Sequence, residues 1–426
     1  MQDDPIRHPH RRSILVTTAM VMATVAGLVS APAIAQEPIK IGFAMSLTGP
    51  LGANGKSALL AMKIWEDDTN AKGGLLGRKV QLVNYDDQSN PATVPGIYTK
   101  LLDIDKVDLI IGGYATNMLA PAMPVAMQRK KVLIGLYGLS VNQKFKYDRF
   151  FAMAPNGPNP KASLSKMFFD TVMAFDPKPK SIAIVAADAE FSKNASDGAR
   201  ENAKALGLDI VYDKTYPPAT TDFAPIIRAI QATNPDIVFV GSYPLDSVGL
   251  VQAAAELDLK TKAFGGAMVG LQASVFKAKL GESLNGIVNY DYWLPAPKFM
   301  TPAVSEFLAK YQARAAAEGV DPLGYYMGPY GYAHIQLLGQ AIAGSNSIDD
   351  GKIAEYLHAK THTTLIGDIK FAADGEWEFD RQILVQFRGI KGNGLDQFKG
   401  MDVQPVLYPP DAKTGSAIPF NDARKK

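Results

Sequence analysis

Two hydroxyl side chains, Thr116 and Ser140, stand where a carboxylate could be bound. Each follows a short apolar stretch that predicts a strand, residues 109–111 for Thr116 and residues 132–134 for Ser140. A helix is predicted between them, so the two strands should run parallel and bring both hydroxyls to one carboxyl edge. Open α/β sheets bind ligands at that edge, and exposed amides at the start of a helix favour an anion. The sequence therefore predicts half of a carboxylate-binding cleft in this stretch.

Residue types that carry catalysis are sparse. The chain has no cysteine, which excludes thiol catalysis and cysteine-ligated metal. It contains no Gly-x-Ser-x-Gly elbow, no phosphate loop of the Gly-x-x-x-x-Gly-Lys type, and no clean Gly-x-Gly-x-x-Gly fingerprint. We therefore expect no enzyme, no catalytic residue and no cofactor.

Few histidines and acid pairs are available for a metal site. His358 and His362 stand at a spacing that can bind zinc, but the residues between them lack the glutamate that metalloproteases place after the first histidine. A solvated helix face is the better interpretation, with no metal. Asp86 and Asp87 are adjacent on a predicted strand and point to opposite faces, so we expect them to order the rim of the cleft.

The first 35 residues predict a secretory signal. Arg7, Arg11 and Arg12 precede an apolar run over residues 14–29, and Ala33-Ile34-Ala35 is a small-x-small cleavage site. The run is too short for a stable membrane span. An ordinary secretory signal and a twin-arginine signal both remain open. The mature protein is therefore expected in the periplasm.

Length, composition and charge indicate a globular protein of two domains or lobes. The chain has 426 residues, of which 47% are hydrophobic and 20% are charged. Without residues 1–35 it keeps 41 Lys and Arg against 40 Asp and Glu, a net charge of +1 (44 minus 3, and 42 minus 2). A net charge this small produces no electrostatic field that would attract nucleic acid, so no nucleic-acid partner is expected. We also expect a monomer.

Strand and helix patterns alternate along the chain. In the first part, strands are predicted at 39–43, 80–85 and 109–111, and one helix has the apolar face Ala58, Ala61, Met62 and Trp65. After a Pro- and Gly-rich break at 156–160 the alternation begins again, with strands at 182–186, 208–212, 237–240, 263–265 and 287–290. The alternation predicts parallel sheets with right-handed crossovers.

The last part of the chain predicts helices and a closing pair of strands. Helices are expected over 302–318 and about 323–343, and strands over 369–371 and 382–387 joined by an Asp-Gly turn. The tail after Asn393 is rich in Gly and Pro and is expected on the surface.

Several motifs, in order and over about residues 38–390, resemble the leucine/isoleucine/valine-type periplasmic binding proteins of ABC importers. They are Lys40-Ile41-Gly42-Phe43 with Leu47-Thr48-Gly49, the run 70–78 (Asn-Ala-Lys-Gly-Gly-Leu-Leu-Gly-Arg), Tyr85-Asp86-Asp87, and Ile110-Ile111-Gly112 before a polar tip. The resemblance implies the type I fold, two flavodoxin-like parallel-sheet lobes joined by a three-crossover hinge. The crossings would fall near Pro155, near residues 292–295 and near Ile366-Gly367, giving lobe 1 as 36–155 plus 293–366 and lobe 2 as 156–292 plus 367–426.

The resemblance also implies a set of ligand-binding residues. In the first lobe the ligand carboxylate would meet Thr116, flanked by Tyr114 and Ala115, and Ser140, with backbone from Gly138. In the second lobe the matching positions are Phe191 and Tyr243, and a late helix would add Tyr326. For Thr116 alone, a helix N-cap is the competing interpretation.

One departure from the family pattern bears on the ligand. Amino-acid binders carry a glutamate for the α-ammonium where this chain has Met268. Methionine cannot pair an ammonium, so the ligand lacks an α-amino group unless Asp188, Glu190 or Asp246 takes that role. Tyr114, Tyr137, Phe191, Tyr243, Met268 and Tyr326 together suggest an apolar body behind the carboxylate.

The expected function is capture of a small carboxylate, an aromatic or aliphatic acid or an apolar amino acid, by hinge closure and its delivery to an ABC permease in the inner membrane. A ligand sensor that docks on a chemoreceptor or kinase remains an alternative, because both would use the same closed state. An exported hydrolase is the alternative from another class.

Overall fold

The computed structural model describes residues 1–2 and 36–425, and Gln36–Lys426 form one compact unit. The predicted signal sequence, apart from its first two residues, lies outside the described residues. Among the described helices, none has both the length and the apolar character needed to cross a bilayer.

The first sheet is parallel and has the strand order β2-β1-β3-β4-β5. Its first three strands pair directly, as do β4 and β5. Backbone hydrogen bonds from Gly112 to Ile134 (2.8 Å) and from Ala115 to Leu136 (3.1 Å) join β3 to β4. This order is that of flavodoxin-like sheets. The strands are β1 (Ile39–Met45), β2 (Val80–Asp86), β3 (Leu109–Ile110), β4 (Leu133–Gly135) and β5 (Phe150–Ala152).

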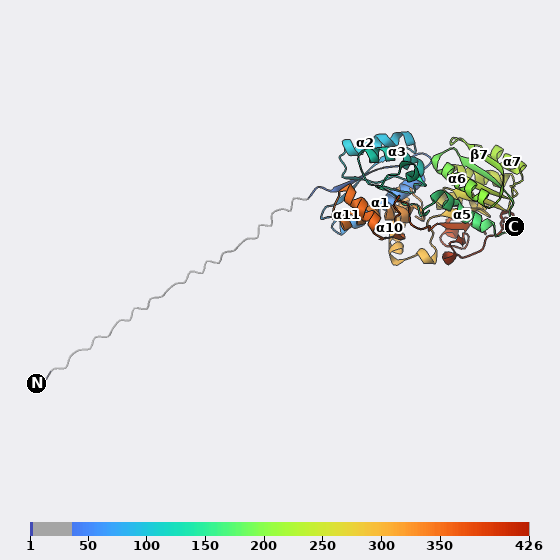
Figure 1. The fold of residues 1–426 in the computed structure, drawn as a ribbon. Helices are drawn as coiled ribbons and strands as arrows, with labels where there is room; N and C mark the ends of the chain where they lie inside the picture. The colour runs from blue at the N-terminus through green and yellow to red at the C-terminus, as the bar shows by residue number, and fades with distance from the viewer. Residues whose placement is uncertain (3–35, 426) are drawn as a thin grey trace. The chain divides into compact units, whose positions relative to one another are not determined.

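Helices from two distant parts of the chain surround this sheet and form the first lobe with it (Figure 1). The face predicted from Ala58, Ala61, Met62 and Trp65 is buried, so that prediction is confirmed. The helices are α1 (Gly52–Ala71), α2 (Val94–Asp103), α3 (Thr116–Gln128), α4 (Val141–Phe145), α10 (Pro302–Glu318), α11 (Met327–Ser345) and α12 (Asp350–Ala359), and the hairpin β11 (His362–Thr364) and β12 (Gly367–Ile369) follows them.

The second sheet has seven strands in the order β14-β13-β10-β9-β8-β6-β7. Its parallel part, β7-β6-β8-β9-β10, repeats the order of the first sheet, which confirms two flavodoxin-like lobes. The strands are β6 (Ser181–Ala187), β7 (Asp209–Tyr216), β8 (Ile237–Ser242), β9 (Ala263–Met268), β10 (Val288–Asp291), β13 (Ile383–Gln386) and β14 (Val406–Tyr408).

The second lobe consists of this sheet and the helices around it. Figure 1 shows α5, α6 and α7 gathered about the sheet that contains β7. The helices are α5 (Pro160–Val172), α6 (Glu190–Ala205), α7 (Ala224–Ala232), α8 (Pro244–Glu256), α9 (Ser274–Leu280) and α13 (Phe420–Ala423).

The structure corrects two predictions for the end of the chain. The strands expected to pair with each other do not: β12 pairs with β11, whereas β13 lies antiparallel between β10 and β14. The tail after Asn393 is also not confined to the surface. It supplies β14, and Phe420 is fully buried with its ring 5.8 Å from that of Phe264. Burial of these apolar side chains binds the tail to the second lobe.

Three passages connect the lobes, and contacts tie them together. The backbone N–H of Arg381 donates to the carbonyl of Pro155 (2.9 Å), and the Tyr292 hydroxyl donates to Asn156 Oδ1 (3.1 Å).

The third passage was predicted near residues 366–367 but lies later in the chain. The Trp377 indole still donates to the carbonyl of Ala152 in β5 of the first lobe (2.8 Å), and β13 of the second lobe begins at Ile383. The chain therefore crosses between Trp377 and Ile383.

A close contact between α1 and α11 gives a prediction for stability. A Cβ added to Gly331 would stand 2.9 Å from the carbonyl oxygen of Ala58. We expect Gly331→Ala to lower the free energy of unfolding by about 1–3 kcal/mol, because the two helix backbones would have to separate. Gly96 of α2 is exposed with nothing within 4 Å, so Gly96→Ala is the matched control and should stabilise by about 0.5–1 kcal/mol. Urea unfolding measures both variants, and similar stabilities for the two would contradict the prediction.

Candidate functional site

The ends of β3 and β4 bring Thr116 and Ser140 to the same edge of the first sheet. Thr116 is the first residue of α3, and Ser140 immediately precedes α4. Thr116 is not a helix N-cap: Ala115 holds that position, and Thr116 Oγ1 instead accepts the N–H of Leu139 at 3.1 Å. This bond links the two loops directly.

Hydrogen-bond donors at this edge lack strong acceptors. The Thr116 hydroxyl reaches only the carbonyl of Tyr137, at 3.5 Å, and Ser140 Oγ is buried without a partner among the described residues. The N–H groups of Thr116 and Asn117, in the first turn of α3, also have no acceptor among the described residues. A buried donor without a partner is costly, so these groups suit a ligand that accepts hydrogen bonds, above all an anion.

Aromatic rings from both lobes wall the space beside these donors, and we call this space the inner pocket. Six of the predicted ligand-binding residues line it: Tyr114, Ala115, Thr116, Phe191, Tyr243 and Tyr326. Tyr137, which the sequence suggested as part of the apolar wall, lines it as well. The remaining lining residues, which sequence analysis missed, are Leu139, Val269, Tyr290 and Tyr292. Tyr290 lies in β10 and Tyr292 directly follows it, where the chain leads into a predicted crossing, and this position is the signal that could have identified them.

Three predicted site residues do not line the inner pocket. Met268 is the last residue of β9, fully buried, and its N–H donates to Asn289 Oδ1 at 2.9 Å. The next residue, Val269, reaches the pocket instead. A Cβ added to Gly138 would stand 3.0 Å from Leu119 Cδ1, and Leu139 lines the pocket where its neighbour Ser140 does not. Among the residues that the structure describes, no acidic side chain lines the inner pocket.

The inner pocket is nearly filled in this conformation. Its volume is about 20 Å³, which holds one water at most. The Tyr137 ring lies 4.8 Å from that of Tyr292 and 5.1 Å from that of Tyr326, and the hydroxyls of Tyr290 and Tyr326 meet at 3.4 Å. Burial raises the pKa of Tyr114 to about 12, so its phenol stays protonated. A ligand must therefore displace these rings or find the lobes apart.

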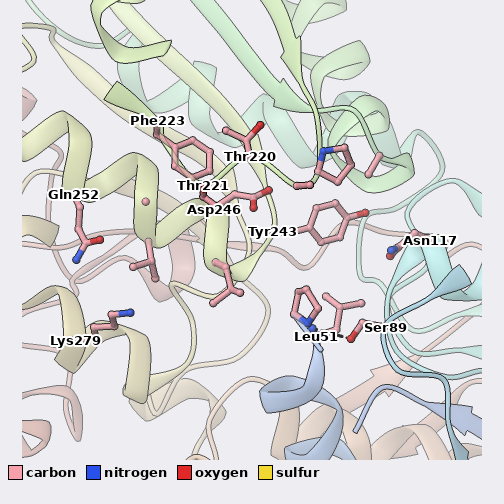
Figure 2. A pocket seen from close by; sticks show the side chains of 17 residues that line it. Leu51, Ser89, Asn117, Thr220, Thr221, Phe223, Tyr243, Asp246, Gln252 and Lys279 are labelled. Atoms are coloured by element: carbon pink, nitrogen blue, oxygen red, sulfur yellow. Dashed lines mark hydrogen bonds between the residues drawn. The ribbon is translucent and has the colours of Figure 1, made fainter. Parts of the chain in front are cut away.

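A larger cavity of about 440 Å³ adjoins the inner pocket and shares Tyr243 with it. We call it the outer groove (Figure 2). One wall carries Leu51, Ser89 and Asn117 from the first lobe, and the other carries residues 218–221, Phe223 and α8 from the second. Asp246 is its buried acid, 7% exposed. Burial raises the pKa of Asp246 to about 6, against hydrogen bonds that include one from the Tyr216 hydroxyl at 3.1 Å.

The described histidines do not form a metal site. His358 contacts the carbonyl of Asp148 (2.8 Å) through its Nε2, and His362 contacts that of Leu357 (3.0 Å). His362 stands on β11 rather than on the helix that carries His358. His334 is buried in α11, and burial lowers its pKa to about 4. Among the described residues no group of three or more His, Asp or Glu side chains is placed to hold a metal ion.

Asp86 and Asp87 both organise the loop after β1. Asp86 accepts the N–H of Leu47 (2.9 Å) and the hydroxyl of Thr48 (2.6 Å), and Asp87 accepts the hydroxyl of Ser46 (2.6 Å). These bonds assign the two carboxylates to holding the loop in place.

Glu376, beside the crossing segments, is a fully buried acid whose two carboxylate oxygens have no partner among the described residues. Burial raises the pKa of Glu376 well above its ordinary value, and Asp374 adds to the shift. The folded protein therefore holds this proton more tightly than the unfolded chain. The stabilising effect is complete below the unfolded pKa of about 4.5 and is lost as pH rises toward the folded pKa.

We expect Glu376→Gln to flatten this pH dependence. The gain in unfolding free energy over the wild type should grow by up to about 1.4 kcal/mol for each pH unit above the unfolded pKa. Urea unfolding at several values between about pH 5 and about pH 7.5 measures it. Glu378→Gln, at an exposed position two residues on, is the matched control. Parallel stability curves for Glu376→Gln and the wild type would show that the Glu376 proton is not linked to folding.

Comparisons with known proteins agree with this fold. The family described as "Periplasmic binding protein" matches residues 38–384. The Leu/Ile/Val-binding protein of Citrobacter freundii is 26% identical over 348 residues, which cover 80% of this chain and 88% of that protein. A leucine-binding protein from Thermotoga maritima has a similar fold (TM-score 0.71, 19% identity, 88% and 99% covered), as does a Rhodopseudomonas palustris solute-binding protein of an ABC transporter in complex with benzoate (TM-score 0.70, 17% identity, 90% and 97% covered).

Proposed function

Because this chain belongs to the periplasmic binding protein family, in its branched-chain amino-acid type, we propose that it captures a small carboxylic acid without an α-amino group. It would act in the periplasm, as a monomer, after export through the N-terminal signal. The closed protein would then deliver the acid to an ABC permease of the inner membrane. Its family relatives are solute-binding proteins rather than enzymes.

One observation carries the proposal: the Thr116 hydroxyl, a buried donor without a strong acceptor, lines an aromatic pocket that has no acid among the described residues, and Ser140 Oγ, a second such donor, follows the lining residue Leu139. Thr116, Ser140 and the first amides of α3 supply the donors for a carboxylate. Rings from both lobes surround the space behind them, which suits an aromatic or aliphatic body. An α-ammonium would be desolvated there without a counter-charge, which costs several kcal/mol.

Lobe closure gives this arrangement its selectivity. The pocket wall combines Thr116 and Tyr326 from the first lobe with Phe191 and Tyr243 from the second, so a bound ligand would touch both lobes only when they are together. A ligand can favour closure only through such differential contacts. The benzoate complex of the Rhodopseudomonas palustris protein, which has this fold, is consistent with an aromatic acid as the ligand.

A ligand screen tests the proposal. Thermal shift followed by calorimetry would compare benzoate, 4-hydroxybenzoate and hexanoate with leucine. We expect one or more of the acids to raise the melting temperature and to bind more tightly than leucine. Tight leucine binding without binding of any of the acids would refute the ligand class.

A further inference from the structure

We propose that the outer groove is a second compartment of the binding site, which takes the far end of an elongated acid through a hydrogen bond from a ligand hydroxyl or ammonium to Asp246. The inference rests on the proposed function, since the carboxylate end would remain at Thr116 and Ser140. Beyond that function, the inference specifies that the ligand is elongated and that its end opposite the carboxylate carries a hydrogen-bond donor.

The first support is the size of the two spaces and their shared wall. The inner pocket has a volume of about 20 Å³ and the outer groove one of about 440 Å³. Tyr243 lines both, is 9% exposed, and accepts the N–H of Phe191 at 3.3 Å through its hydroxyl. The Tyr243 side chain therefore borders both the pocket that contains Thr116 and a space large enough for the rest of a ligand.

The second support is the chemistry of the outer groove. Its apolar lining includes Leu51, Phe223, Leu245 and Val248, which suit a hydrocarbon chain or ring. Asp246 is buried in this lining, and Tyr216 is the one side chain among the described residues that donates to it, through Oδ2. A buried carboxylate that faces a cavity with a single side-chain donor can accept a further hydrogen bond from a ligand.

The position of Asp246 also decides which ligand donor fits. It lines the outer groove and not the inner pocket that contains Thr116. An α-ammonium is attached to the carbon that bears the carboxylate, so it would stay in the inner pocket, away from Asp246. A donor at the opposite end of the molecule reaches the outer groove. The structure thus favours ω-hydroxy and ω-amino acids over α-amino acids.

Calorimetry with hexanoate, 6-hydroxyhexanoate and 6-aminohexanoate tests the proposal on the full mature protein. We expect a terminal donor to tighten binding about tenfold or more relative to hexanoate, as a hydrogen bond to a buried charge does. Asp246→Asn should remove most of that preference. Adipate would overturn the assignment if it bound most tightly, because Lys279, which also lines the groove, would then govern the far end.

Tyr216→Phe is the matched control, because it removes the Tyr216–Asp246 bond while it keeps the carboxylate. We expect Tyr216→Phe to retain the preference for a terminal donor. If both variants lose it equally, or if Asp246→Asn weakens all three ligands by one factor, Asp246 has only a structural role and the inference fails. Binding of hexanoate that depends on Thr116 and Ser140 would still support the proposed function in that case.

Discussion

Replacing Thr116 with valine together with Ser140 with alanine is expected to weaken the binding of a small carboxylic acid by about 100-fold or more. Each hydroxyl would donate a charge-assisted hydrogen bond to the ligand carboxylate, and such bonds contribute roughly 1.5–3 kcal/mol each. Both side chains are buried, and neither hydroxyl donates a strong hydrogen bond within the described residues. Calorimetry with the tightest acid from the ligand screen measures the loss.

Stability separates this effect from misfolding. Ser140 Oγ has no partner among the described residues, so Ser140→Ala should leave the free energy of unfolding nearly unchanged. Thr116→Val removes the acceptor of the Leu139 N–H and should cost roughly 1–3 kcal/mol. Thr116→Ser keeps the hydroxyl and should keep most of the affinity, and Thr99→Val, at an exposed position of α2, controls for the substitution itself. Unchanged affinity in the folded double variant would refute the carboxylate site.

The meeting of Thr116 and Ser140 at one edge of the first sheet could be predicted because it depends on local sequence. A short apolar strand followed by a small polar tip places its last side chains at the carboxyl end, and two such units in succession make neighbouring parallel strands. Thr116 and Ser140 follow from that rule alone. The bond from the Leu139 N–H to Thr116 Oγ1 shows that the loops meet.

Non-local pairing explains the predictions that were wrong. The pattern of β13 reveals a strand but not its partner, and its neighbour β10 ends at Asp291, far earlier in the chain. The same holds for β14, whose glycine- and proline-rich surroundings suggested an exposed tail. For Met268, β9 runs further than the predicted strand, and because side chains alternate along a strand, the pocket receives Val269 instead. Facing and pairing of this kind depend on contacts that no single stretch encodes.

A hydrogen-bonded contact between the lobes bears on how closure is stabilised. Asp321, in the connection between α10 and α11 of the first lobe, accepts the N–H (2.5 Å) and the hydroxyl (2.7 Å) of Ser274, the first residue of α9 in the second lobe. The carboxylate also accepts the N–H groups of Leu323 and Gly324 through Oδ1. It is 8% exposed. If the lobes separate to admit a ligand, the two bonds to Ser274 must break.

Asp321→Asn is therefore expected to weaken the binding of every ligand by the same factor, about 30-fold, because the substitution destabilises only the closed state. An asparagine amide can keep its oxygen at Oδ1, where three donors converge, but its NH₂ group then faces the Ser274 N–H. Two opposed donors in place of a charged bond should destabilise closure by roughly 2 kcal/mol. Ser274→Ala, which removes only the hydroxyl bond, should have a smaller effect in the same direction. Calorimetry with benzoate and hexanoate gives the factors, and small-angle scattering gives the open fraction. A loss confined to one ligand would place Asp321 in ligand recognition, and an unchanged open fraction would show that its bonds to Ser274 do not control closure.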